Sequence, residues 1–193
     1  MSKLYKIKFN YVSPLMMHST RGANPLDPLA KESKKISSKR SKTEEDHLQL
    51  MKLDYQLGAY YDEEIGFFLP AEMVEACIRE GAKANRNGTK AKTAIFINEE
   101  RIKLQHDGPN TLEEAYERED MKDVRIVTVN NSKILRCRPR FNRWAIEFTL
   151  TLEDDILSED ELIHAIHIAG KQKGLGDYRP RYGRFEAIIE EIA

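Results

Sequence analysis

A run of glycines and cations near the end of the chain restricts the possible fold more than any other stretch. It reads GKQKGLGDYRPRYGRF over residues 170–185 and contains four glycines, five cations and two tyrosines. Glycine permits positive φ angles and lets another backbone segment come close. Arginine offers a planar fork of donors that fits phosphate, and tyrosine offers a ring on which a base can stack. The run therefore predicts a tightly turned cationic loop that lies against a polyanion.

The loop residues that we expect to contact nucleic acid are cations, glycines and a tyrosine: Lys171, Lys173, Gly174, Gly176, Tyr178, Arg179, Arg181 and Arg184. Tyr182 is a second candidate for base stacking. The alternative is a tight helix-to-strand connection whose arginines pair with acidic segments. Four glycines exceed what one such connection needs, which favours contact with a ligand.

Charge is segregated along the chain rather than spread evenly. The net charge of -1 argues against a uniformly basic nucleic-acid coat. Residues 31–42 nevertheless hold six cations against one acid, and residues 133–143 hold five cations and no acid. Acids gather instead in residues 113–123 and 153–161. Any polyanion site must therefore be local.

Cysteine use and hydropathy predict a cytoplasmic protein that does not enter membranes. Cys77 and Cys137 lie far apart and form no CxxC pair, so neither a disulfide scaffold nor a cysteine zinc site is indicated. A reducing compartment fits this usage. The first residues lack an apolar leader, and no stretch reaches the ~20 apolar residues that span a bilayer.

Alternating apolar residues predict strands at both ends of the chain. Residues 4–11 alternate with a half-buried period, residues 144–152 repeat the pattern more clearly, and residues 185–189 predict a closing strand. Short strands are also expected at 66–70, 93–97 and 101–104, and a hairpin from 124–129 and 134–137.

Capping residues and apolar stripes predict three longer helices, and Thr111 with Glu114 predicts the start of a brief acidic helix. Thr43 with Asp46 and Ser158 with Glu161 have capping-box spacing, and a third stripe runs over residues 71–85. Residues 20–42 are poor in apolar side chains and rich in Ser, Lys and Arg, which predicts a mobile loop.

These elements predict an α+β fold and a single domain over residues 1–193. We expect a ferredoxin-like or RRM-like antiparallel sheet with helices on one face. A long, partly disordered insertion after the first strand, at about residues 20–65, completes the predicted organisation.

Three stretches resemble the RAMP superfamily, the repeat-associated mysterious proteins that form RRM-like subunits of CRISPR effector complexes. They are FNYVSPL at 9–15 followed by His18, FFLPAEMVEACIR at 67–79, and the loop GLGDYRPRYGRF at 174–185. Residues 71–73 read AEM where the family often has Gly-Ser-Ser, so the resemblance is to a diverged relative such as a phage would carry.

The resemblance implies an RNA-binding protein whose partners are RNA or a protein–RNA complex, CRISPR effector subunits, or further copies of the chain. For a phage protein it also implies mimicry of a CRISPR backbone subunit against a host defence complex. The cationic tract at 31–42 would then be a thumb-like insertion that becomes ordered on RNA.

Two further sets of cations are candidate nucleic-acid contacts. Arg136, Arg138 and Arg140 follow the strand period, so with Arg143 beyond them they would form a cationic ridge on the hairpin. A solvated strand face is an equal alternative. Arg79 and Lys83 end the second predicted helix, and Arg86, Lys90 and Lys92 follow them.

His18 is a weak candidate for catalysis. Processing endonucleases of the superfamily use a histidine and a glycine-rich loop to cleave RNA without a metal, the 2′-hydroxyl being the nucleophile. The sequence places no second acid or base beside His18. Asp27 lies in the segment where some backbone subunits of the family carry a cleavage aspartate, but a turn aspartate beside proline is the commoner explanation.

No cofactor or metal site is indicated. His164 and His167 are spaced to reach one metal, yet no carboxylate accompanies them at a matching spacing. Walker, Rossmann and Ser/His/Asp signatures are not found.

The leading hypothesis is a non-enzymatic protein that binds RNA or a ribonucleoprotein surface through the glycine loop and the arginine hairpin. One alternative is a metal-independent endoribonuclease that uses His18. Another is a protein–protein interaction module whose working surface is the acidic stretch 113–123 or 153–161.

Overall fold

The computed structural model describes residues 2–192, which form an α+β structure with a mostly antiparallel main sheet. Its strand order is β10, β1, β9, β6, β4, β3, and β5 also pairs with β9. The strands are β1 (Ser2–Tyr11), β3 (Tyr61–Asp62), β4 (Gly66–Pro70), β5 (Ile95–Ile97), β6 (Arg101–His106), β9 (Trp144–Glu153) and β10 (Phe185–Glu191). The strands predicted at both ends of the chain are therefore confirmed, and they lie side by side.

The alternation of β1 and β9 places one face of each strand in the core. Tyr5, Ile7 and Phe9 are fully buried, as are Ile146 and Leu150 opposite them. Phe9 also stacks on Phe185 of β10, with ring centroids 3.9 Å apart. Strand β1 is thus held by aliphatic and aromatic contacts to β9 on one side and β10 on the other.

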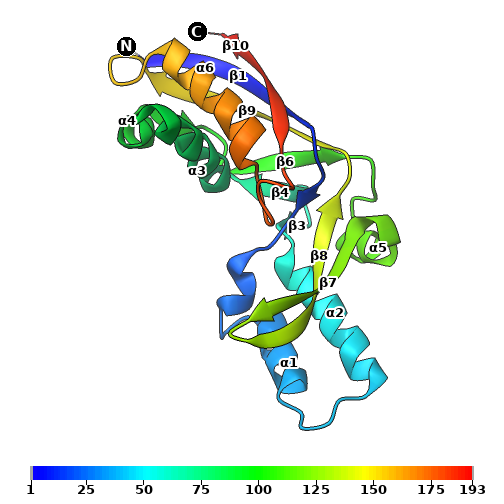
Figure 1. Ribbon diagram of the computed structural model, residues 1–193. Helices are drawn as coiled ribbons and strands as arrows, with labels where there is room; N and C mark the ends of the chain where they lie inside the picture. The colour runs from blue at the N-terminus through cyan, green and yellow to red at the C-terminus, as the bar shows by residue number, and fades with distance from the viewer. Residues whose placement is uncertain (1, 193) are drawn as a thin grey trace.

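Helices α3 (Ala71–Ala82), α4 (Gly88–Ala94) and α6 (Glu159–Ile168) cover one face of the main sheet (Figure 1). α3 and α6 cross very closely at Gly81, where a Cβ atom would lie 2.1 Å from the carbonyl oxygen of Ala165. Short turns continue both helices: η2 (Lys83–Asn85) follows α3, and the π-turn η4 (Ala169–Lys173) follows α6. Only glycine permits this crossing, which fixes the two helix ends beside each other.

A smaller sheet extends below the main one in Figure 1. Its order is β2 (Leu15–Met16), β8 (Ser132–Phe141) and β7 (Lys122–Val129). The hairpin predicted from residues 124–137 is confirmed as β7 and β8. Helices α2 (Glu44–Gly58) and α5 (Leu112–Glu117), with the turn η3 (Glu119–Met121), pack near these strands.

The segment after the first strand differs from the partly disordered insertion that the sequence predicts. It contains the turn η1 (Thr20–Ala23), α1 (Pro28–Ser37), α2 and β3. Asp27 caps α1, accepting hydrogen bonds from the backbone N–H of Leu29 and Ala30, and the Ile36 side chain is buried. Capping and packing against α2 therefore order a segment with few apolar residues.

The helix predicted after Thr43 is confirmed, and its capping box is complete. No helix of residues 2–192 is long and apolar enough to cross a bilayer.

Candidate nucleic-acid interface

The glycines of the C-terminal loop make close backbone contacts. Gly174, Gly176 and Gly183 have φ angles of 74°, 73° and 73°. A Cβ on Gly183 would lie 1.8 Å from the Leu175 carbonyl oxygen, and one on Gly176 would lie 2.3 Å from that of Met16. Each of these glycines therefore has a structural role, whether or not a ligand binds to the loop.

Hydrogen bonds join the loop to itself and to the smaller sheet. The backbone N–H of Leu175 donates to the Gly183 carbonyl at 2.8 Å, and that of Asp177 donates to the Met16 carbonyl at 2.8 Å. The Leu175 side chain is fully buried. The loop is consequently a fixed part of the fold, and its residues Asp177, Tyr178 and Tyr182 contact arginines of β8 and β7.

Tyr178 is held beside two arginines of the smaller sheet. The guanidinium carbon of Arg138 lies 5.3 Å from the centroid of its ring. Arg125 contacts the same ring and donates a hydrogen bond of 3.1 Å to the Tyr182 hydroxyl. Tyr178 remains 37% exposed, so part of its ring is presented to solvent in a fixed position.

Two of the hairpin arginines have acid partners within the protein. Arg136 donates to Asp54 of α2 at 2.8 Å, and the N–H of Cys137 donates to the same carboxylate at 2.7 Å. Arg138 is 7% exposed, and its Nε lies 2.9 Å from Oδ2 of Asp177 without the alignment of a hydrogen bond. The expected ridge is thus directed toward α2 and the loop.

The other two hairpin arginines differ in exposure. Arg140 is half-buried, with a buried Nε that has no hydrogen-bond partner among residues 2–192. Arg143 lies exposed in the turn between β8 and β9. Of the four predicted hairpin cations, Arg143 is the one most accessible to a ligand.

Tyr178 lies at the edge of a recess between the loop and the end of α3, which we call the tyrosine recess. Its volume is about 590 Å³. Lining it are Glu80, Gln172, Lys173, Gly176, Asp177, Tyr178, Arg179 and Pro180. Arg179 is exposed, and neither Lys173 nor Arg179 has an ion-pair partner within the described part of the chain. The structure therefore brings two predicted cations and the predicted stacking residue together.

A second recess adjoins the first, and we call it the basic recess. Its volume is about 470 Å³, and its lining is Arg79, Lys83, Arg86, Gly88, Thr89 and Lys92. Glu80 of the tyrosine recess pairs with Lys83 at 2.5 Å. This hydrogen bond, aided by Lys173 and Arg79, lowers the pKa of Glu80. Cations from both recesses thus surround one carboxylate, and the two recesses are neighbours.

The remaining loop cations lie elsewhere. Lys171 and Arg184 line a separate recess of about 520 Å³ with Phe185 and His167. Arg181 is exposed outside all these recesses. The loop cations predicted from the sequence as one group therefore fall into at least two places.

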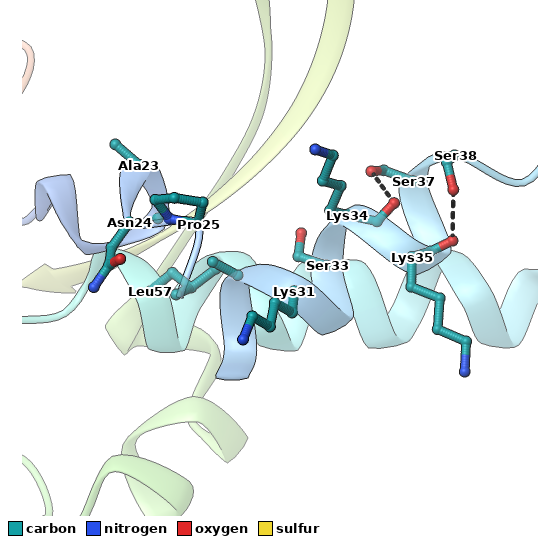
Figure 2. A pocket seen from close by; sticks show the side chains of 12 residues that line it. Ala23, Asn24, Pro25, Lys31, Ser33, Lys34, Lys35, Ser37, Ser38 and Leu57 are labelled. Carbon is teal, nitrogen blue, oxygen red and sulfur yellow. Dashed lines mark hydrogen bonds between the residues drawn. The ribbon is translucent and has the colours of Figure 1, made fainter. Parts of the chain in front are cut away.

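The lysines of α1 border a cavity of about 730 Å³. Figure 2 shows that they diverge: Lys34 points to one side of α1, while Lys31 and Lys35 point to the other. Two serines of this lining, Ser37 and Ser38, bond to backbone carbonyls of the same helix. The lysine side chains of α1 therefore do not converge on one position where a ligand could bind.

His18 lines a cavity of about 330 Å³ together with Ser19, Asp54 and Arg136. Desolvation of the ring and the nearby charges of Arg138 and Arg136 lower the pKa of His18, although the residue retains an exposed surface. Asp54 is engaged by Arg136 and by the backbone N–H of Cys137. The structure thus places charged neighbours around His18 that the sequence alone did not reveal.

Asp27 acts as a helix cap, and its other carboxylate oxygen accepts from Arg21 Nε at 2.6 Å. His164 and His167 are exposed on α6. Within residues 2–192 no three His, Cys, Asp or Glu side chains are grouped to hold a metal ion.

No protein-family model matches this chain, and no curated protein matches it.

Proposed function

We propose that this protein binds single-stranded RNA, or an RNA-containing complex, without cleaving it. The observation that carries the proposal is Tyr178, a partly exposed ring held by Arg125 and Arg138 beside Lys173 and Arg179. An aromatic ring next to cations is the usual arrangement for stacking a base while holding its phosphates. Because the ring is already held in place, stacking would cost little side-chain entropy.

The order of elements supports an RRM-like core for this proposal. The alternation of a ferredoxin-like fold is found, with other elements inserted between its members, in β1, α3, β6, β9, α6 and β10. Together with the resemblance of the first strand, of α3 and of the loop to the RAMP superfamily, this favours a relative of CRISPR backbone subunits. Mimicry of such a subunit by a phage protein is the wider form of the proposal.

A binding experiment tests the proposed site. Fluorescence anisotropy would measure the affinity for a labelled single-stranded RNA between about 50 and 200 mM salt. We expect Lys173→Gln/Arg179→Gln to weaken binding at least about tenfold and to reduce the salt slope by roughly 1 to 1.5. Tyr178→Leu should weaken binding by roughly 1–3 kcal/mol with the salt slope unchanged.

The matched control is Arg40→Gln/Lys103→Gln, which also removes one arginine and one lysine charge, but from exposed positions outside both recesses. If the two double variants bind alike, the site is misplaced. If the wild-type protein shows no salt-dependent affinity for RNA, the proposed function itself fails.

The His18 cavity supports a second candidate function, cleavage of RNA without a metal. A histidine with a lowered pKa is neutral near pH 7 and can accept the proton of a 2′-hydroxyl. That oxygen would then attack the adjacent phosphorus as the P–O5′ bond breaks, giving a 2′,3′-cyclic phosphate and a 5′-oxygen that takes its proton from water. Arg136 lies in the same cavity and could steady the phosphate charge.

Incubation of labelled RNA with the protein in EDTA decides between the two functions. Cleavage that is lost in His18→Ala would favour the nuclease. Retention of intact RNA by both proteins would favour the binder.

A further inference from the structure

The basic recess has a lining in which most residues are positively charged. Four of its lining residues, Arg79, Lys83, Arg86 and Lys92, are cations, and none of the described lining residues is acidic or aromatic. Lys83 has Glu80 as a partner. Arg79, Arg86 and Lys92 have no ion-pair partner in the range 2–192.

A sharp backbone turn between α3 and α4 forms the basic recess. Arg86 adopts a left-handed conformation, with φ 63° and ψ 17°, at the end of η2. Such a conformation is unfavourable for a residue with a Cβ, and it turns the chain sharply from α3 into α4. The side chain of Lys83 lies directly against Gly88, where a Cβ would be 2.7 Å from Lys83 Cγ. The turn thus gathers cations from two helices around one volume.

The neighbouring cation Lys90 is directed elsewhere. Its Nζ lies 3.6 Å from Glu161 of α6, and Asn87 donates to the same carboxylate at 2.9 Å. Lys90 therefore belongs to the attachment of this turn to α6, whereas Arg79, Arg86 and Lys92 have no acid partner among residues 2–192 and remain available to a ligand.

The composition of the lining points to a doubly charged phosphate. An internal phosphodiester carries one charge, and bases near it require a ring or an amide for recognition. A phosphomonoester carries between 1.5 and 2 negative charges near pH 7 and presents three acceptor oxygens. The recess supplies ammonium and guanidinium donors and the Thr89 hydroxyl, but no surface for a base.

We propose that the basic recess binds a phosphomonoester group, and that in the RNA complex this group is the terminal phosphate of the bound strand. The assignment of the terminal phosphate rests on the proposed function, because the strand would leave the basic recess through the neighbouring tyrosine recess. Lys83 and Glu80, which pair across the border, mark where the two recesses meet.

The test compares three labelled RNAs of one sequence that carry a 5′-phosphate, a 3′-phosphate or only hydroxyl ends. We expect one phosphorylated RNA to bind at least about tenfold more tightly than the hydroxyl RNA, given charge-assisted bonds to several donors. Arg86→Gln/Lys92→Gln should remove this difference and leave the affinity for the hydroxyl RNA within about threefold of wild type.

The matched variant Arg40→Gln/Lys103→Gln removes one arginine and one lysine charge from exposed positions outside the recess and should keep the difference. Circular dichroism spectra would check that both double variants are folded. Calorimetric titration with inorganic phosphate and with adenosine 5′-monophosphate tests whether a free phosphomonoester also binds.

The outcomes separate the two proposals. Equal binding of all three RNAs by the wild-type protein overturns the phosphate site and leaves RNA binding standing. Binding of adenosine 5′-monophosphate that requires Arg86 and Lys92, without any affinity for RNA, supports the phosphomonoester site and overturns the RNA function. Absence of binding to all of these probes overturns both.

Discussion

The guanidinium carbon of Arg125 lies 4.5 Å from the centroid of the Tyr178 ring, so a strand of the smaller sheet holds a side chain of the C-terminal loop. The Nε atom and one terminal nitrogen of Arg125 also donate hydrogen bonds to the carboxylate of Asp123, a residue that is 6% exposed. The arginine thus neutralises a buried acid and fixes the tyrosine of the tyrosine recess. The smaller sheet supports the candidate interface as well as extending the fold.

Removal of the Arg125 guanidinium should destabilise the protein and loosen the loop. Arg125→Gln leaves the buried Asp123 without its main partner, and we expect the free energy of unfolding to fall by about 1–3 kcal/mol, since the arginine is partly exposed. Urea unfolding measures this change, and the near-ultraviolet circular dichroism of the tyrosines should weaken in the folded variant.

Arg118→Gln provides the comparison. Arg118 makes the same two-pronged contact with Asp120, but both side chains are about half exposed, at 46% and 51%. Its loss should cost less than about 1 kcal/mol. Equal effects of the two substitutions would show that burial of Asp123 does not determine the contribution of Arg125.

Glu80 should oppose RNA binding, because its carboxylate lies among the cations of both recesses. Glu80→Gln removes a negative charge beside the phosphates of a bound strand and keeps the size of the side chain. We expect RNA affinity to rise about two- to fivefold, as for a single exposed charge interaction. Anisotropy at low salt measures this gain; a loss of affinity would mean that the Glu80 to Lys83 pair positions Lys83 for the ligand.

Substitution of Gly66 or Gly183 by alanine should distinguish the cost of a left-handed backbone conformation from the cost of overpacking. Gly66 and Gly183 have φ angles of 82° and 73°, but a Cβ on Gly66 would be 3.8 Å from its nearest neighbour and one on Gly183 only 1.8 Å. Gly66→Ala should therefore cost about 1–2 kcal/mol, from the left-handed conformation alone. Gly183→Ala should cost about 2–5 kcal/mol, because overpacking adds to the strain. Similar denaturant midpoints for the two variants would contradict the close contact of Gly183 with Leu175.

His106 should make stability depend on pH. Its ring packs edge-on against Phe67 and Phe141, and its Nδ1 accepts a hydrogen bond of 3.2 Å from the Gly108 N–H. Desolvation, with a contribution from Lys103, lowers the pKa of His106 below its ordinary value of 6.5. The unfolded chain therefore binds the proton first, so stability is complete above 6.5 and decreases as the pH falls through the folded pKa.

The measurement is urea unfolding at about pH 7.5 and about pH 5.5, on either side of the histidine titration. His106→Gln should lose less stability between these values than the wild-type protein, whereas the exposed His164→Gln should behave like wild type. His18, whose pKa is also lowered, contributes a change of the same sign. An identical pH dependence in His106→Gln would contradict the assignment.

Local patterns in the sequence predicted most elements of the main sheet and its helices. Period-two alternation identified β1 and β9, and the capping residues Thr43 and Ser158 marked the starts of α2 and α6. These signals depend only on neighbouring residues. Helix α1 escaped prediction because its stability comes from the Asp27 cap and from packing on α2, with Ile36 as the one buried side chain among the described residues of the helix.

The candidate interface could be predicted only in part. Its residue types were visible, and Lys173, Tyr178, Arg179, Arg79 and Lys83 do come together around the two neighbouring recesses. The partners of the hairpin arginines were not visible, because Asp54 and Asp177 approach Arg136 and Arg138 from distant parts of the chain. A strand period shows that arginines share a face, but not what that face meets.

The position of β1 between β9 and β10 has a consequence for synthesis on the ribosome. Residues 2–11 leave the ribosome before either neighbour of this strand, because both neighbours lie at residues 144–153 and 185–191. At ~5–20 residues per second, β1 waits on the order of 10 s for its first partner. Throughout this interval its apolar residues Tyr5, Ile7 and Phe9 have no sheet to join. The nascent chain therefore has a window in which chaperones, or the matching strand of another nascent chain, can capture its first strand before the sheet closes.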